Sequence, residues 1–258
     1  MPGEGVPHRL PGRLIVSLTS YPPRYATLSL TLRSLLSQRV RPDRTILWVA
    51  HGHAAALPPA VTDLVPFGLE VRECDDIRSF KKIIPALEAF PDAFIVTADD
   101  DQYYPPEWLA ELERGYLANP GSIVCHRARV MRFDERGAPL AYRSWRRAVS
   151  PAEAPLLPTG FGGVLYPPHS LAPQVSDLEL FEALCPEADD LWLKWMSAAA
   201  GTRVTLMMSN GPRYSWPNSQ RVALARANVR KGGNDRQAAA LAGRFGTGFF
   251  VAAGEAVR

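Results

Sequence analysis

Residues 93–109, AFIVTADDDQYYPPEWL, lead from an apolar run directly into three consecutive aspartates. The run 93–98 predicts a buried strand, and Pro105 and Pro106 predict the start of a helix that carries Trp108 and Leu109 on one side. Three adjacent carboxylates repel one another and need water or a cation nearby. This stretch therefore predicts a buried strand that ends in a cluster of negative charge with water or a cation near it.

The chain on either side repeats the pattern of a short apolar run followed by a helical one. Strands are expected at 13–20, 45–50 and 69–74, and helices at 28–36 and 80–90. Strands that alternate with helices predict βαβ units, and continuous apolar strands indicate a parallel sheet covered on both faces. The predicted fold class is α/β and Rossmann-like, with a mostly parallel central sheet flanked by helices.

The second half reads differently. Residues 122–133 predict one long strand, 134–160 predict loops, and the glycine-rich segment 160–168 predicts a bend that runs into a short strand. Helices are expected at about 177–184 and 190–200, a last strand at 203–209, and a short helix in the tail. The Pro/Gly-rich residues 1–12 are expected to be flexible.

Composition limits the class of protein. The 258 residues are 47% hydrophobic and 21% charged, which is typical of a globular protein. A net charge of +3 with scattered Lys and Arg argues against a nucleic-acid partner, but suits an anionic substrate or peripheral contact with an anionic membrane surface. The three cysteines form no CxxC pair, and neither a signal peptide nor a membrane span is evident. We expect a cytoplasmic protein, possible also at the inner face of the membrane.

Four of the predicted strands end in polar residues. In open α/β sheets ligands bind beyond the carboxyl ends of the strands, so these ends are candidate binding residues. The alternative is that strand ends are polar only because loops are solvated. The four ends are Thr19-Ser20-Tyr21, His51-Gly52-His53, Asp75-Asp76 and Asp99-Asp100-Asp101.

The aspartate triplet is a candidate metal site. Asp99 and Asp101 lie two apart on an extended segment, so their carboxylates should project the same way. Two such carboxylates can hold Mg²⁺ or Mn²⁺ and leave positions for phosphate oxygens. The alternative is a solvated acidic turn that favours the N-terminus of the following helix.

VTADDDQYYPPEWL resembles the DXD segment of GT-A fold glycosyltransferases of the bacterial, family-2-like kind. Four further segments, taken in order, are similar to the same group: IVSLTSYPPR with LTLRSLLSQ and RTILWVA, then CDDIRSFKKIIPAL, TGFGGVLYPP and CPEADDLWLKWM. The resemblance implies a nucleotide-diphosphate-sugar donor, a divalent cation (Mn²⁺ or Mg²⁺), a glycan or lipid-linked acceptor and a role in polysaccharide biosynthesis. It implies one domain over 13–258, with a nucleotide-sugar half (13–118), an acceptor half (119–235) and a tail (236–258).

Roles follow from the resemblance residue by residue. Asp99 and Asp101 would bind the cation, and Asp100 would lie near the ribose or sugar. Donor-side contacts would also come from Thr19, Ser20, Tyr21, Arg24, Asp75 or Asp76, and Lys82. Each has a structural alternative: a stiff Tyr-Pro-Pro turn, a helix cap at the Asp pair, or a solvated lysine face. Gly160, Phe161, Gly162 and Gly163 would border the donor sugar and the acceptor, unless they form only a tight bend.

The carboxylates Asp189 and Asp190 stand at the start of a predicted helix. The resemblance implies Asp190 as the general base of an inverting transfer, with Asp189 beside it. The competing interpretation makes either residue an ordinary N-cap. The functional hypothesis is a metal-dependent glycosyltransferase, the alternatives being a sugar nucleotidyltransferase or a non-catalytic nucleotide- or glycan-binding module. Trp145, Arg146 and Arg147 are candidates for contact with a sugar or an anionic acceptor lipid.

Overall fold

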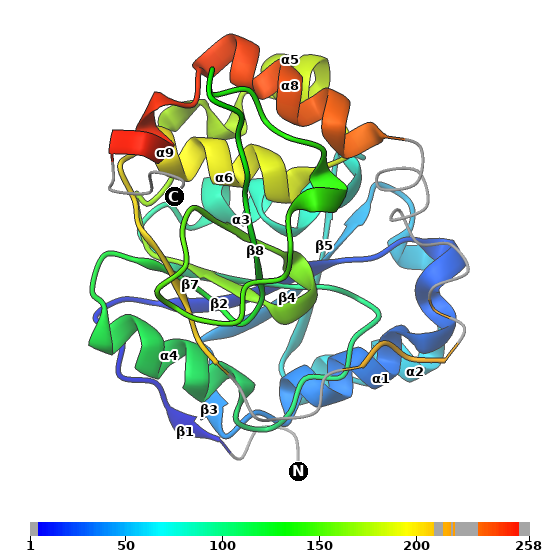
Figure 1. Ribbon diagram of the computed structural model, residues 1–258. Coiled ribbons are helices and arrows are strands. Elements are labelled where there is room, and N and C mark those ends of the chain that lie inside the picture. The colour runs from blue at the N-terminus through cyan, green and yellow to red at the C-terminus, as the bar shows by residue number, and fades with distance from the viewer. Residues whose placement is uncertain (1–4, 209–213, 218, 220–231, 253–258) are drawn as a thin grey trace.

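The computed structural model describes residues 5–208, 214–217, 219 and 232–252. Its centre is a seven-stranded sheet that crosses the molecule between layers of helices (Figure 1). From one edge to the other the strands are β11 (Val204–Leu206), β7 (Ile123–Cys125), β10 (Val164–Tyr166), β6 (Phe94–Ala98), β2 (Leu14–Thr19), β4 (Arg44–Ala50) and β5 (Leu69–Cys74).

Most neighbours in this sheet are parallel. β6, β2, β4 and β5 run the same way, as do β7 and β11, whereas β10 is antiparallel to both of its neighbours. Side chains of β2 alternate between two buried faces: Leu14 and Val16 pack into one core cluster, and Ile15 into another. Burial on both faces explains the continuous apolar strands, and the predicted α/β, mostly parallel fold class is confirmed.

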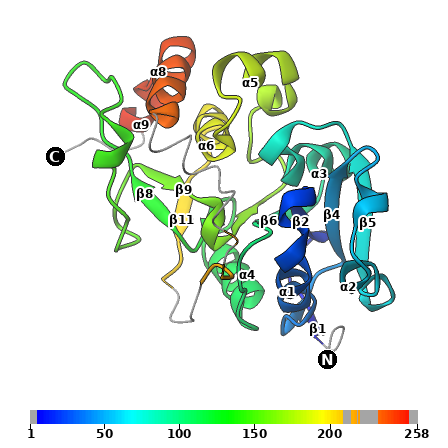
Figure 2. The ribbon, with the colours of Figure 1, turned by 90° about the vertical axis from the view of Figure 1, so that its right-hand side faces the viewer.

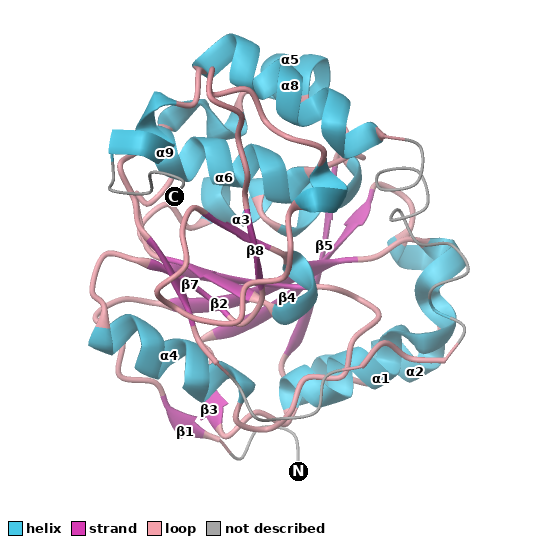
Figure 3. Ribbon diagram, viewed as in Figure 1, coloured by secondary structure: helices cyan, strands magenta, loops and turns pink. Residues whose placement is uncertain are grey.

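Helices cover both faces of the sheet (Figure 3). One face is covered by α1 (Tyr25–Leu36), α2 (Pro59–Thr62) and α4 (Trp108–Ala118), which bury their apolar stripes in a common cluster. The other face is covered by α3 (Ile84–Ala89) and α6 (Asp189–Ala199). Beyond α6 lie α5 (Leu178–Leu184), α8 (Gly233–Phe245) and α9 (Gly248–Ala252). Among the described helices, none has the length and apolar composition needed to cross a membrane.

The predicted elements of the first half are present. The strands at 13–20, 45–50, 69–74 and 93–98 are β2, β4, β5 and β6, and the proline-led helix is α4, which begins at Trp108. The helix expected over 80–90 is divided into a 3-10 turn, Arg78–Lys82, and α3. Pro85 lies in the first turn of α3, where its missing N–H leaves no bond unmade.

Two expectations for the second half were wrong. The strand expected over 122–133 is two strands, β7 and β8 (Ala128–Val130), which belong to different sheets. β8 pairs antiparallel with β9 (Leu156–Pro158), a strand inside the region predicted to be loops. The apolar residues of β7 are followed by two adjacent polar residues, His126 and Arg127, before the alternation of β8 begins, and this short interruption marks where the chain leaves the main sheet.

The N-terminal segment also differs from expectation. β1 (Val6–Pro7) pairs in parallel with β3 (Val40–Arg41), and Leu10 is buried, so residues 6–10 are held against the domain. Residues 1–4 of the predicted flexible segment, Ser209 of the predicted last strand and residues 253–258 of the predicted tail lie outside the described residues.

Candidate functional site

Two adjacent parallel strands bring the predicted ligand residues together. β2 and β6 pair with Leu18 opposite Ala98, so Ser20 and the aspartate triplet follow at the same edge of the sheet. The start of α6 reaches this edge as well, because its Asp189 contacts a lysine that also holds Asp99. The site is therefore built at the carboxyl ends of the strands, where open α/β sheets bind ligands.

Lys82 joins the two acidic segments. Its Nζ lies 3.0 Å from Asp99 Oδ1 and 2.9 Å from Asp189 Oδ2, and the lysine is buried. Burial alone would lower the pKa of Lys82, but the charges of Asp189 and Asp99 raise it well above its usual value. Lys82 is thus a fixed buried cation that couples the end of β6 to the start of α6. In this structure Lys82 pairs with carboxylates, and its predicted contact with the donor stays a prediction.

Asp190 occupies the first turn of α6 and is held by a backbone donor. The Gly160 N–H donates to both of its carboxylate oxygens, at 3.1 and 3.3 Å. Burial raises the pKa of Asp190 to about 7, and the charge of Asp189 acts in the same direction, while Lys82 opposes them. The N-cap of α6 is Ala188, and no side chain caps it. The interpretation of Asp189 or Asp190 as an ordinary N-cap was therefore wrong.

Asp100, the middle residue of the triplet, is bound by two side chains that follow β2. Its Oδ2 accepts from Ser20 Oγ at 2.6 Å, and its Oδ1 from Arg24 Nη1 at 2.8 Å. Burial raises the pKa of Asp100 to about 6, against the opposing charge of Arg24. Asp100 is 6% exposed, so in this structure it organises the loop after β2. Its predicted contact with a ribose or sugar remains a prediction.

The carboxylates of Asp99 and Asp101 turn to different cations. Asp99 is bound by Lys82, whereas Asp101 Oδ2 lies 2.9 Å from Arg24 Nη1, the atom that also holds Asp100. The strand ends at Ala98 and the chain turns at Asp100, so the extended geometry expected for the pair does not continue. Within the described part of the chain, no group of three or more His, Cys, Asp or Glu side chains gathers as a metal site.

The donor set still suits a hard cation that shares its shell with a substrate. Mg²⁺ is usually held by one or two carboxylates together with phosphate oxygens, not by an all-protein cage. Asp99 meets this requirement because its carboxylate is partly exposed at the strand end. The predicted cation at Asp99 and Asp101 stays a prediction.

At the two ends of the glycine segment, Gly160 and Gly163 allow neighbouring groups to lie closer than any other residue would permit. A side chain at Gly160 would meet Lys82 Nζ at 2.8 Å and Asp99 Oδ1 at 3.0 Å, so only glycine leaves this centre intact. Gly163 has φ +83° and would place a Cβ 2.4 Å from Trp108 Cζ2. Gly162 accepts a hydrogen bond from Trp108 Nε1 at 2.8 Å. Gly160 therefore serves the charged centre, while Gly162 and Gly163 serve packing against α4.

The remaining predicted donor-side residues lie around this centre. Thr19 Oγ1 donates to the Trp48 carbonyl at 2.9 Å, and the side chain of Tyr21 hydrogen-bonds to Arg24. Asp75 is exposed, 3.5 Å from His51 Nε2. Asp76 bonds to Lys81, which lowers the pKa of its carboxyl, and accepts from the Arg78 N–H at 3.3 Å as a local cap.

Two neighbours of the site were not anticipated from the sequence. The Asp99 N–H donates to Tyr104 Oη at 2.7 Å, which fixes the end of β6 through a buried tyrosine. Arg127 and Phe161 form a cation–π pair, with the guanidinium carbon 4.5 Å from the ring centroid. The signal for Tyr104 was its place in the QYYPP turn. No sequence signal pointed to Arg127, because it lay within the predicted long strand 122–133.

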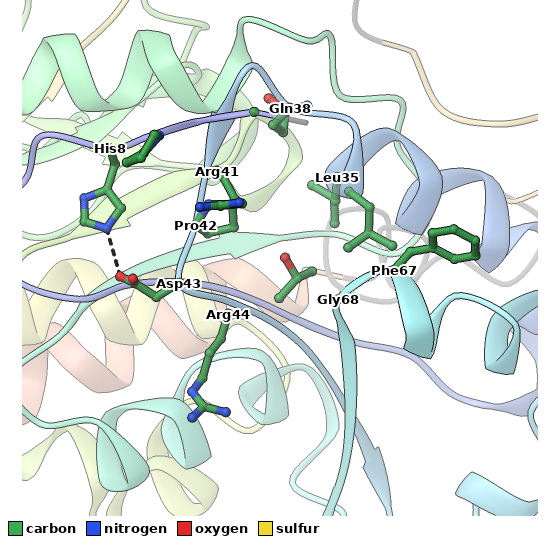
Figure 4. A pocket seen from close by; sticks show the side chains of 13 residues that line it. His8, Leu35, Gln38, Arg41, Pro42, Asp43, Arg44, Phe67 and Gly68 are labelled. Atoms are coloured by element: carbon green, nitrogen blue, oxygen red, sulfur yellow. Dashed lines mark hydrogen bonds and ion pairs between the residues drawn. The ribbon is translucent and has the colours of Figure 1, made fainter. Parts of the chain in front are cut away.

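A cavity of about 530 Å³ lies at the opposite, amino-terminal ends of the strands, next to the start of β4 (Figure 4). Its walls include Arg41, Asp43 and Arg44 at the start of β4, and Figure 4 shows His8 bonded to Asp43, with Nε2 2.8 Å from Oδ2. None of the predicted ligand residues lines it. The charged centre at the carboxyl ends is the better candidate, because parallel α/β sheets place ligands there.

A comparison with protein-family models and with curated proteins finds no match. Among solved structures, the 1–349 fragment of S. aureus TarS in complex with UDP aligns with a TM-score of 0.50 at 14% identity. The alignment covers 79% of this chain and 60% of the TarS fragment. The fold is GT-A-like.

Two other solved structures align with the GT-A-like fold at lower scores. A 4-diphosphocytidyl-2C-methyl-D-erythritol synthase gives a TM-score of 0.47 at 12% identity, covering 83% of this chain and 98% of its own. The inositol-1-phosphate CTP transferase from T. maritima gives 0.46 at 12%, covering 94% and 98%. At these identities, the similarity concerns the fold alone.

Proposed function

We propose that the protein is a glycosyltransferase that moves a sugar from a nucleotide-diphosphate sugar to an acceptor hydroxyl, with inversion at the anomeric carbon. The observation that carries the proposal is the centre formed by Lys82, Asp99, Asp189 and Asp190 at the carboxyl edge of a GT-A-like sheet. The aligned TarS fragment binds UDP, which supports a nucleotide donor on this fold.

Asp190 is the proposed general base. Its carboxylate is fixed by the Gly160 N–H, and its pKa of about 7 lets it accept a proton at neutral pH. Asp189 is committed to Lys82, which leaves Asp190 as the carboxylate of the pair available to a substrate.

The transfer removes one proton from the acceptor and replaces one bond at the anomeric carbon by another. Asp190 takes the proton of the acceptor hydroxyl while that oxygen forms a bond to the anomeric carbon. The bond between the anomeric carbon and the diphosphate oxygen breaks, and its electron pair leaves with the nucleoside diphosphate. The sugar carries positive charge in the transition state, as in glycoside hydrolysis, and the carboxylates around Lys82 provide a negative surround for it.

Asp99 and Asp101 would hold the divalent cation. When bound there, the cation would act as a Lewis acid that neutralises charge on the departing diphosphate. Lys82 and Arg24 hold these carboxylates in the present structure, so binding of cation and donor would have to draw Asp99 or Asp101 away from them.

The experiment combines ligand binding with a base variant. Nucleoside diphosphates and their sugar conjugates are screened by thermal shift with and without Mn²⁺, and transfer is then followed as release of the nucleoside diphosphate. Asp190→Asn should keep donor binding and lose transfer by at least about 100-fold. Asp177→Asn is the matched control, because Asp177 caps the start of α5 through the Leu180 N–H at 3.0 Å, outside the site.

The outcomes separate the alternatives. No shift with any nucleotide or nucleotide sugar would argue for a different class of ligand altogether. Pyrophosphate release from a nucleoside triphosphate and a sugar phosphate would identify a nucleotidyltransferase. Donor binding without hydrolysis or transfer by the unaltered protein would favour a non-catalytic module. Near-normal turnover of Asp190→Asn would place the base on another residue.

A further inference from the structure

We propose that Arg127, Arg129 and Arg147 form a binding site for an oxyanion group, phosphate or carboxylate, carried by the acceptor. The assignment of this anion to the acceptor rests on the proposed function, whereas the anion site itself rests on the geometry of these three residues. Arg127 directly precedes β8, Arg129 belongs to it, and Arg147 lies in the loop between β8 and β9, a pair of strands that was not predicted from the sequence.

The backbone places the three arginines on one surface. Arg127 and Arg129 lie two apart and flank the buried Ala128, so their side chains leave the strand on the same face. Arg129 is directly opposite Arg147 in an antiparallel bridge. Like charges in directly opposed positions destabilise a sheet, so an anion bound between them would relieve their repulsion.

Aromatic rings and a carbonyl hold two of the guanidinium groups. Arg127 lies over the Phe161 ring at 4.5 Å, and Arg129 lies over the Tyr142 ring at 5.0 Å. Arg129 Nη1 also donates to the Trp145 carbonyl at 2.6 Å. Trp145 itself is fully buried, so it supports this loop. The contact with a sugar that was expected for it from the sequence is therefore excluded in this structure.

No direct ion pair of the described residues neutralises the three guanidinium groups. Over the described part of the chain, no carboxylate lies within 4 Å of the Arg127, Arg129 or Arg147 guanidinium, and Arg127 Nε is buried with no hydrogen-bond partner. Burial lowers the pKa of Arg127, and the charges of Arg147 and Arg129 lower it further. Arginines with a planar fork and unmet donors are suited to a bidentate oxyanion.

The cluster lies on the acceptor side of the proposed base. Asp190 is close enough to raise the pKa of Arg127, and β9 contacts α6, the helix that carries Asp190. Figure 2 shows β8 and β9 across β6 from β4 and β5, the strands of the nucleotide half. An anion held here would therefore belong to the molecule that approaches Asp190 from the side opposite the donor.

The test uses glycerol 1-phosphate as the anionic probe and glycerol as its neutral counterpart, with binding to the full chain measured by calorimetry. We expect saturable binding of the phosphate that weakens with added salt, and no binding of glycerol. The Arg127→Gln/Arg147→Gln double variant should bind the phosphate at least about tenfold more weakly, since it loses two charged donors. Arg132→Gln is the matched control: its side chain is exposed on the same half of the chain, and it should bind as the unaltered protein does.

A second arm distinguishes the acceptor anion from the donor diphosphate. If the cluster serves the acceptor, a saturating nucleoside diphosphate should leave phosphate binding unchanged, and the double variant should bind the nucleoside diphosphate normally. A tenfold loss of nucleoside-diphosphate affinity in the double variant would assign the cluster to the donor and overturn the proposal. Equal phosphate affinity in all three proteins would overturn it as well. A protein that binds glycerol 1-phosphate through the cluster but binds no nucleotide would keep the anion site and refute only the glycosyl transfer.

Discussion

Replacement of Lys82 by methionine is the sharpest perturbation that the charged centre offers. Methionine keeps the unbranched stem of the lysine and removes its charge. The Nζ lies 3.0 and 2.9 Å from carboxylates of Asp99 and Asp189, so its loss leaves two paired carboxylates without their shared cation. The lysine is buried, and its pKa is raised by these partners, so its stabilising charge is present throughout the pH range in which the protein can be studied.

The magnitude follows from the geometry. Breaking a buried pair by removal of one partner costs about 3–5 kcal/mol, because the other charge stays buried and unpaired. The cost should grow with pH. Lys82 lowers the pKa of Asp190, which is about 7. At pH 5 Asp190 is protonated in both proteins. By pH 8 Asp190 has ionised in the unaltered protein, whereas the raised pKa in the variant keeps the proton bound, and this difference adds up to about 1.4 kcal/mol of destabilisation between pH 7 and pH 8.

The assay is urea denaturation at pH 5 and pH 8, with Lys81→Met as the matched control. Lys81 is the adjacent lysine and is equally buried, but its partner Asp76 is exposed, so its loss should cost no more than about 1 kcal/mol at either pH. Equal losses in the two variants, or a loss for Lys82→Met that does not grow between pH 5 and pH 8, would refute the account of Lys82 as the cation that holds the centre together.

Three further predictions concern the base, the glycine turn and the metal. The kcat/KM for transfer should fall about tenfold per pH unit below about 7, as Asp190 takes up its proton, and a flat profile would exclude Asp190 as the base. The folded state keeps this proton where the unfolded chain has lost it, so Asp190→Asn should raise the urea midpoint at pH 8 but not at pH 3. Gly163→Ala should destabilise by more than about 2 kcal/mol, because the new Cβ meets Trp108 at φ +83°. Gly201→Ala, at φ +71° in open space, should cost only about 1 kcal/mol in the same denaturation assay. EDTA should abolish the thermal shift produced by a nucleoside diphosphate and Mn²⁺ should restore it, whereas a shift unaffected by EDTA would contradict the predicted cation at Asp99.

The first half of the fold could be predicted because its signals are local. A parallel strand covered on both faces reads as a continuous apolar run, and β2, β4 and β6 each do so. The break between β7 and β8 has no such signal. Only the two adjacent polar residues His126 and Arg127 interrupt the pattern there, and the change of sheet depends on pairing with Thr159 and Gly163, which lie far along the chain.

The segments that form the site could be predicted from the sequence, but the contacts between their side chains could not. Ligand residues at the ends of β2 and β6 follow from the general rule for open sheets, and the two ends are indeed adjacent. The partner of each charge depends on which side chains the completed fold brings within 3 Å. Asp100 was expected near the ribose or sugar, and the protein side chains that bind it, Ser20 and Arg24, were not predicted as its partners. Asp99 and Asp101 were expected to act together, yet they face different cations because the chain turns between them.

The division of labour between Asp189 and Asp190 shows what the fold adds to the sequence. Two adjacent acids at a helix start are equivalent in the sequence, and either could cap the helix or act on a substrate. Successive residues in the first turn of α6 point in different directions, so one carboxylate reaches Lys82 and the other meets the Gly160 N–H. The charge of Asp189 is offset by the lysine, while burial raises the pKa of Asp190 and the charge of Asp189 raises it further. Burial together with a paired acid is a means of producing a base near neutral pH from a residue that is normally ionised, and the fold supplies both at Asp190.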